Sequence, residues 1–175
     1  YYKIMRNILL NRMTAYALAG LLMIAGETPV FAADTIQEKI VVLALGDSLT
    51  AGFGVDPEEN FPSRLQLKID NAGLAYKVVN AGVSGDTTAG GVRRINWLMK
   101  HKPQIVILAL GANDGLRGLS TDEMRSNLET MIRISQEHGA RVLLAGMKAL
   151  PNYGEDYILK FESVYPELAK KYDLA

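Results

Sequence analysis

The stretch that most constrains the fold of this chain is Ile40–Gly54, IVVLALGDSLTAGFG. Its first six residues are all apolar, rich in Val, Ile and Leu, with neither a charge nor a turn residue among them. A short run of this kind predicts a strand that is buried on both faces, as in a parallel sheet. The run stops at Gly46-Asp47-Ser48, so a serine follows the carboxyl end of a central strand, where open α/β sheets bind their ligands. A turn residue that caps the next segment is the structural alternative for Ser48 at this point.

Apolar strands and helical patterns alternate along the rest of the chain. Further strands are predicted at 76–80, 104–110 and 141–146, and helices between 60 and 73, over 92–101, between 120 and 139, and over 157–172. This alternation indicates βαβ units with right-handed crossovers and a parallel sheet. The predicted fold class is α/β: a doubly wound, three-layer α/β/α domain with four strands in this chain.

Three of the predicted strands end in loops with unusual polar or glycine residues: Gly46-Asp47-Ser48, Ser84-Gly85-Asp86 and Gly111-Ala112-Asn113-Asp114. In a parallel sheet these loops emerge at the same carboxyl edge, so we expect them to converge although they lie far apart in the sequence. Ser48 would serve as the nucleophile of an acyl transfer and would need a base to take its proton. The N–H groups of Ser48 and Gly85 and the side-chain amide of Asn113 would donate to the oxyanion that forms.

Charge and cysteine content exclude several classes of function. The 19 Lys and Arg residues balance the 19 Asp and Glu residues, so no basic surplus points to nucleic acid. The sequence has no cysteine, which excludes disulfides, thiolate nucleophiles and Cys-ligated zinc. Asp47 is expected to form loop hydrogen bonds rather than serve as a triad acid, because as the neighbour of Ser48 it cannot orient a base. Asp86 and Asp114 are expected to fix their loops rather than bind metal, because no cluster of His or carboxylates accompanies them. No metal or organic cofactor is implied, and the pair Arg93-Arg94 is expected to be a solvated helix face.

The first 32 residues have the pattern of a secretory signal peptide. Basic residues near the start precede the apolar run Ala15–Gly26, and small residues follow at Val30-Phe31-Ala32. We predict cleavage between Ala32 and Ala33, which leaves 33–175 as a mature domain in the periplasm or outside the cell. The run is too short for a comfortable membrane span, although an uncleaved anchor is the alternative. The mature part has a small acidic surplus, so no stable attraction to an anionic membrane is expected after cleavage.

Three blocks of the sequence, GDSLTAG, NAGVSGDT and LGANDGLRG, occur in an order and spacing that resemble the SGNH (GDSL) hydrolases. The group with the most similar pattern is that of the bacterial secreted arylesterases and acyl-CoA thioesterase I/lysophospholipases. The resemblance implies a flavodoxin-like sandwich around a five-stranded parallel sheet. It also implies that Ser48 is the nucleophile and that Gly85 and Asn113 are the remaining oxyanion-hole donors. The implied function is a serine esterase that hydrolyses small carboxylic esters, with acyl thioesters as a further candidate class, through an acyl-enzyme intermediate.

One part of the family pattern is missing from this sequence. The family carries an Asp-x-x-His block near its C-terminus, which supplies the base and the carboxylate that orients it, and residues 1–175 contain no such block. We therefore expect a chain that is truncated at its C-terminus, with a fifth strand and the block beyond Ala175. His101 and His138 are predicted at the starts of strands, on the opposite edge of the sheet from Ser48. This chain is consequently expected to be almost inactive by itself, and an inactive fragment is one alternative.

Two further alternatives remain open at this point. A carbohydrate O-acetylesterase would have the same fold, although the segment Pro151–Gly154 favours the arylesterase and thioesterase group. A flavodoxin-like binding or receiver module would share the topology without the chemistry. A receiver would need an acidic cluster and a phosphate-binding Lys around the end of the first strand, and only Asp47 is present there.

Overall fold

The computed structural model describes residues 38–174. Its sheet contains β1 (Ile40–Gly46), β2 (Tyr76–Gly82), β3 (Ile105–Ala109) and β4 (Arg141–Leu144), in the spatial order β2-β1-β3-β4. All three neighbouring pairs are parallel. The predicted α/β fold with a parallel sheet is thus confirmed. Because the chain returns from β2 across β1 to β3, the strand order reverses between β1 and β3, which is where doubly wound folds bind their ligands.

The helices follow the predicted alternation with strands, and two short ones were not predicted. The elements are α2 (Ser48–Ala51), α3 (Phe61–Asn71), α4 (Thr88–Leu98), α5 (Ala112–Leu116), α6 (Thr121–Glu137) and α7 (Glu155–Tyr172), with 3₁₀ turns η1 (Met99–His101) and η2 (Pro151–Tyr153). The N-caps of α3 and α6 are Asn60, which accepts the Ser63 N–H at 2.9 Å, and Ser120, which accepts the Glu123 N–H at 3.3 Å. The helix predicted over 92–101 begins earlier, at Thr88.

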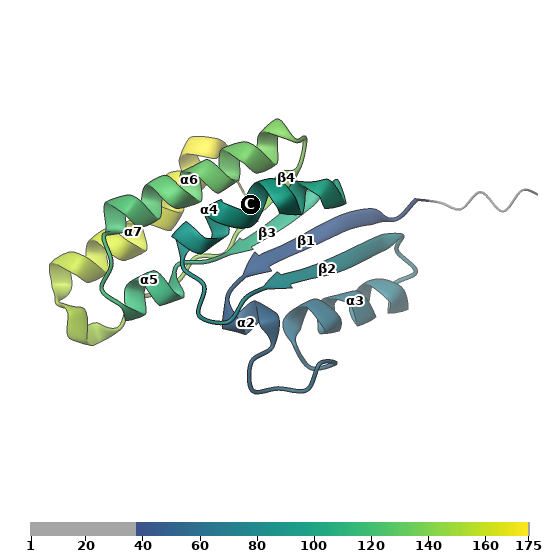
Figure 1. Cartoon of the computed structure of the whole chain (residues 1–175), viewed down its shortest axis with the longest axis horizontal. Coiled ribbons are helices and arrows are strands. Elements are labelled where there is room, and N and C mark those ends of the chain that lie inside the picture. Colours follow the sequence, from purple (N-terminus) through teal and green to yellow (C-terminus); the bar gives the residue numbers. More distant parts are fainter. Residues whose placement is uncertain (1–37, 175) are drawn as a thin grey trace, which may run out of the picture. The chain divides into compact units, whose positions relative to one another are not determined.

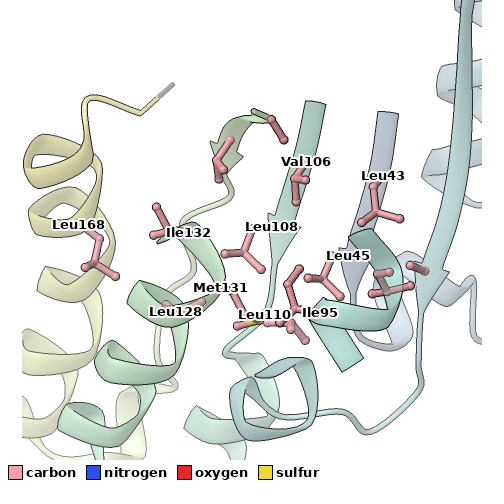
Figure 2. Packing of buried hydrophobic residues seen from close by; sticks show 14 of the residues in the cluster. Leu43, Leu45, Ile95, Val106, Leu108, Leu110, Leu128, Met131, Ile132 and Leu168 are labelled. Atoms are coloured by element: carbon pink, nitrogen blue, oxygen red, sulfur yellow. The ribbon is translucent and has the colours of Figure 1, made fainter. Parts of the chain in front are cut away.

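The helices form two layers of unequal extent on the sheet. Figure 1 shows α3 on one face and α4, α6 and α7 on the other. The larger layer encloses the main apolar core, which is built from alternate residues of the strands and the inner sides of the three helices (Figure 2). Leu43 and Leu45 of β1, Leu108 of β3 and Leu128 of α6 are almost fully buried there. Burial of this kind is the main favourable contribution to folding.

The opposite face of the sheet is covered less completely. Alternate residues of the strands, Val42, Ile105, Ile107 and Leu143, line an apolar groove beside α3 with a volume of about 250 Å³. Leu143 is 42% exposed. The apolar runs of the last two strands therefore have one deeply buried face and one half-covered face in the part of the chain that the structure describes.

The predicted signal peptide and its cleavage point between Ala32 and Ala33 lie outside the described residues. Within residues 38–174, none of the helices combines the length and the apolar character that crossing a bilayer requires.

Candidate active site

Ser48 lies directly after β1, at the first position of the four-residue helix α2. The N-cap of this helix is Asp47, whose carboxylate accepts the Leu49 N–H at 3.0 Å. The capping role considered for Ser48 therefore belongs to its neighbour, and the Ser48 side chain is left half-exposed. As the first helical residue, Ser48 also has a backbone N–H without a partner inside the helix.

Helix α2 packs against the end of β2 through a position that only glycine can occupy. A β-carbon built on Gly82 would lie 2.1 Å from the backbone nitrogen of Ala51. The backbone of β2 and that of α2 consequently touch directly, without a side chain between them. This close approach sets the position of α2, and with it that of Ser48.

The loop after β2 contains a tight turn in which Gly85 has a φ of +78°. The turn is closed by the Asp86 N–H, which donates to the Val83 carbonyl at 3.1 Å. A side chain would be strained at this φ, so the turn requires glycine. The Gly85 carbonyl accepts a hydrogen bond from Arg117 at 2.8 Å, which ties the loop to the segment after β3.

Asn113 connects all three loops. It lies in α5, directly after β3, and its side-chain amide donates to the backbone carbonyl of Asp86 at 2.9 Å. The same nitrogen is 3.4 Å from an oxygen of the Asp47 carboxylate. The structure thus brings together the loops that carry Ser48, Gly85 and Asn113, as the parallel topology predicted.

The two remaining carboxylates of these loops have structural partners. Asp114 is buried and accepts both the N–H (2.9 Å) and the hydroxyl (2.6 Å) of Thr88 at the start of α4. Asp86 accepts from Arg94 at 2.8 Å. The prediction that these acids fix their loops is confirmed. Among the residues that the structure describes, no three His, Asp or Glu side chains gather in a way that could hold a metal ion.

Burial changes the titration of Asp47. Its pKa is raised above the ordinary value of 3.8, mainly because the carboxylate is removed from water. The hydrogen bond from the Leu49 N–H acts in the opposite direction, and the negative charges of Asp86 and Asp114 raise the pKa further. The site therefore holds a carboxyl group that is harder to ionise than an exposed one.

The prediction that Arg93 and Arg94 both lie on a solvated helix face is wrong for Arg94. Arg93 is exposed, as expected of a solvated helix face, but Arg94 points inward and donates to Asp86, Ala81 and Gly46. Gly90, one turn earlier on α4, makes room for this arrangement, because a β-carbon there would lie 1.5 Å from an Asp86 oxygen. Gly90 and Gly91, directly before the predicted helix and about one turn before Arg94, were the available signal for this contact.

A second group that the sequence did not indicate lies on α7 and η2. Tyr153, Tyr157, Phe161 and Tyr165 form an aromatic ladder, with successive ring centroids 5.4, 6.2 and 5.8 Å apart. Its three hydroxyls donate to backbone carbonyls around Asn113: Tyr165 to Leu110 (3.2 Å), Tyr153 to Leu116 (2.6 Å) and Tyr157 to Leu119 (2.9 Å). Burial raises the pKa of Tyr165, which keeps its hydroxyl protonated and able to donate.

Both histidines are at the other end of the sheet, as predicted. His101 ends η1 shortly before β3, and His138 caps the end of α6 before β4. His101 packs edge-on against Trp97 with 5.8 Å between the ring centroids, and Nδ1 of His138 is 2.8 Å from the Ile134 carbonyl oxygen. Neither imidazole is at the edge where Ser48 lies.

Comparison with known proteins agrees with this arrangement. The profile of the GDSL-like Lipase/Acylhydrolase family matches residues 44–175. Esterase TesA of Pseudomonas aeruginosa is 40% identical over 158 residues, which cover 90% of this chain and 76% of that protein. An arylesterase of Vibrio mimicus is 41% identical over 140 residues, covering 79% of this chain and 69% of that protein.

Solved structures show the same similarity. AlinE4, described as an SGNH-hydrolase family esterase, is 44% identical, and its crystal structure superposes with a TM-score of 0.76 over 80% of this chain and 76% of that chain. The order of three sequence blocks, the meeting of their loops at one sheet edge and these matches all lead to one assignment. The chain belongs to the GDSL-like lipase/acylhydrolase family, also known as the SGNH hydrolases.

Proposed function

We propose that the protein is a serine esterase in which Ser48 is the nucleophile and the N–H groups of Ser48 and Gly85 and the Asn113 amide form the oxyanion hole. The observation that carries this proposal is the hydrogen bond of 2.9 Å from the Asn113 amide to the Asp86 carbonyl. It joins the loop after β3 to the loop that contains Gly85, beside the half-exposed Ser48. The family relatives named esterase and arylesterase support carboxylic esters as the substrates.

The proposed reaction has two steps. The Ser48 hydroxyl oxygen bonds to the ester carbonyl carbon and its proton passes to a base, while the carbonyl oxygen becomes an oxyanion. The C–O bond to the leaving alcohol then breaks, the alcohol takes up a proton, and an acyl-enzyme remains. Water attacks the acyl-enzyme in the same way, which releases the carboxylic acid and restores Ser48. Acyl thioesters would follow the same course with a thiol as leaving group.

Asn113 has one amide hydrogen to offer to the oxyanion. Of its two N–H bonds, one is engaged by the Asp86 carbonyl at 2.9 Å. The contact with the Asp47 carboxylate, at 3.4 Å, is long for a hydrogen bond. An oxyanion would therefore replace a weak contact, while the 2.9 Å bond keeps the amide in position.

The mechanism needs a base beside Ser48, and no histidine among residues 38–174 lies there. His101 and His138 precede β3 and β4 and are therefore on the opposite sheet edge. The family resemblance assigns this role to an Asp-x-x-His block, which the 175 residues lack. A serine hydroxyl without an adjacent base is a weak nucleophile at neutral pH. We accordingly expect reaction at Ser48 to be specific but slow.

A fluorophosphonate probe tests the assignment of the nucleophile. The chain is incubated with the probe, and the adduct is mapped by peptide mass spectrometry. The label should be on Ser48 and should disappear in Ser48→Ala. Ser84→Ala is the matched control, because Ser84 is an exposed serine in the neighbouring loop and should not affect labelling. Labelling that persists in Ser48→Ala would contradict the proposal.

We infer from the sequence that the protein is exported, with residues 1–32 as a signal peptide and residues 33–175 as the mature hydrolase domain. The support is the basic start, the apolar run and the small residues before Ala33. Expression in a bacterial host followed by fractionation should give periplasmic protein whose N-terminal residue is Ala33. Cytoplasmic protein that retains Arg12 would refute this inference.

A further inference from the structure

Arg94 is the one arginine of α4 that turns toward the candidate site, and each of its three guanidinium nitrogens has an acceptor. Nε donates to the Asp86 carboxylate at 2.8 Å. Nη1 donates to the Ala81 carbonyl at 2.6 Å, and Nη2 to the Gly46 carbonyl at 3.0 Å. The Arg94 side chain is only 20% exposed and that of Asp86 only 11%. Ion pairs that are this well shielded are screened by solvent much less than surface pairs.

The three acceptors belong to the segments that hold the candidate catalytic groups. Gly46 is the last residue of β1 and is followed directly by Asp47 and Ser48. Ala81 is next to the last residue of β2. Asp86 closes the turn that contains Gly85, and its backbone carbonyl is the acceptor for the Asn113 amide. One guanidinium group therefore contacts the end of β1, β2 and the loop after β2. It has no direct contact with Asn113, but the residue whose carboxylate it binds, Asp86, also accepts the hydrogen bond of the Asn113 amide.

The Gly46 carbonyl is where two of these segments meet. It accepts the Val83 N–H at 3.0 Å as well as the Arg94 guanidinium. The bond from Val83 joins the loop after β2 to the end of β1, beyond the last paired residues of the two strands, Gly46 and Gly82. Arg94 also binds the Asp86 carboxylate and the Ala81 carbonyl, which lie beside this bond and the turn at Gly85. Without Arg94, these two acceptors would lose their donor, and the loop after β2 would be held less firmly.

Arginine is suited to this role in a way that lysine is not. The guanidinium group is planar and presents its donors in a fixed fork, whereas the lysine ammonium is a single point of charge on a flexible stem. A lysine at this position could keep the charge interaction with Asp86, but it could not hold three acceptors with three separate nitrogens.

We propose that Arg94 is a positioning residue for acyl transfer: it holds the loops of Ser48 and Gly85 in register and, through Asp86, orients the Asn113 amide. This proposal rests on the function proposed above. Arg94 acts through backbone and carboxylate partners and has no contact with the substrate. Its loss should therefore slow the chemical step and leave substrate binding nearly unchanged.

The test compares Arg94→Met with Arg93→Met. Both replace an arginine of α4 by an unbranched apolar side chain, but only Arg94 contacts the loops. Phosphonylation of the chain by a fluorophosphonate is followed at several probe concentrations, which separates the maximal rate constant from the half-saturating concentration. Since misplacing a reacting group by about 1 Å costs on the order of 10²-fold in rate, Arg94→Met should lower the maximal rate constant by about that factor. Arg93→Met should react like the unmodified protein, and Arg94→Lys should fall between them.

A second readout does not depend on reactivity. In Arg94→Met the Val83 backbone amide should exchange with solvent faster than in Arg93→Met, because the loop after β2 loses the guanidinium group that links the Asp86 carboxylate to the Ala81 and Gly46 carbonyls. The NMR signals of the Asn113 side-chain amide should shift as well. If Arg94→Met does not fold, the same comparisons are made with Arg94→Lys.

The outcomes separate this proposal from the proposed function. Labelling that does not require Ser48 would contradict the proposed function, whereas the amide measurements would still report whether Arg94 holds the loops. An Arg94→Met protein with wild-type Val83 exchange would overturn the positioning role. So would a loss of reactivity that lies entirely in the half-saturating concentration.

Discussion

Gly82→Ala is the substitution whose effect on the site follows most directly from the structure. Gly82 is the last residue of β2, and a β-carbon on it would lie 2.1 Å from the Ala51 nitrogen, 2.6 Å from the Thr50 carbonyl carbon and 2.7 Å from the Ala51 α-carbon. All three atoms are backbone, so no change of rotamer can relieve the overlap. Either α2 or the end of β2 has to move.

The size of the effect can be worked out from these distances. Ordinary contact begins at 3.4 Å, so the two segments must separate by roughly 1.3 Å from the 2.1 Å approach. Overpacking of this kind costs about 1–3 kcal/mol of unfolding free energy. Ser48 is the first residue of the helix that would be pushed away. Because a displacement of about 1 Å can cost on the order of 10²-fold in rate, phosphonylation of Ser48 should slow by about that factor.

The assay combines thermal unfolding with the fluorophosphonate rate, and Gly146→Ala is the control. A β-carbon on Gly146 would lie 3.8 Å from its nearest neighbour, a Tyr165 side-chain atom, which is an ordinary contact. Its unfolding free energy should change by no more than about 0.5 kcal/mol. If Gly82→Ala melts and reacts like Gly146→Ala, the close approach of α2 to β2 does not determine the position of Ser48, and the reasoning fails.

Three further predictions concern the chemistry of the site. Asn113→Ala should lower the maximal phosphonylation rate by about 10²–10³-fold with little change in the half-saturating probe concentration, because one oxyanion donor is lost. An effect on the half-saturating concentration alone would mean that Asn113 only binds the probe. Added imidazole should accelerate hydrolysis of p-nitrophenyl acetate by the unmodified chain more than by Ser48→Ala, because imidazole can act as the base that residues 38–174 do not bring to Ser48. Equal acceleration of both proteins would contradict this. Asp47→Asn tests the raised pKa of Asp47. A carboxyl group whose pKa is higher in the folded than in the unfolded protein stabilises the fold when it is protonated. This stabilisation is complete at a pH below the ordinary pKa of 3.8 and is lost as the pH rises through the pKa of the folded protein. Melting curves from pH 3.5 upward should therefore show the melting temperature of the unmodified protein falling relative to that of Asp47→Asn, and a relative rise would refute the assignment.

The features that could be predicted from the sequence are those that topology dictates. Apolar runs alternating with helical patterns predicted a parallel sheet, and in such a sheet the loops after successive strands share one edge. This is why the sequence alone could predict that Ser48, Gly85 and Asn113 lie together. The catalytic roles given to them remain predictions, whereas the hydrogen bonds of the Asn113 side chain to Asp47 and Asp86 show that their loops meet. The placement of His101 and His138 at the other edge follows from the same rule.

The features that escaped prediction depend on side-chain direction or on very short elements. Arg93 and Arg94 are chemically identical neighbours, and they differ only in the direction that each side chain takes from α4. Arg93 is exposed, whereas Arg94 binds the end of β1, β2 and the loop after β2. Helices of four or five residues, such as α2 and α5, are too short for a periodic pattern to emerge. The hydrogen bonds of the aromatic ladder depend on how α7 lies against the loop after β3, which a local pattern does not encode.

The aromatic ladder also has a consequence for how this protein can change over generations. Its hydroxyls bind the carbonyl oxygens of Leu110, Leu116 and Leu119, and every amino acid has that same oxygen. The side chains of Leu116 and Leu119, 56% and 39% exposed, take no part in these bonds. Mutations at these two positions can therefore alter the surface beside Asn113 while the path of the backbone is preserved. Because these bonds do not depend on the side chains of the residues that carry the carbonyls, single substitutions at Leu116 and Leu119 should leave the anchoring of the segment after β3 in place.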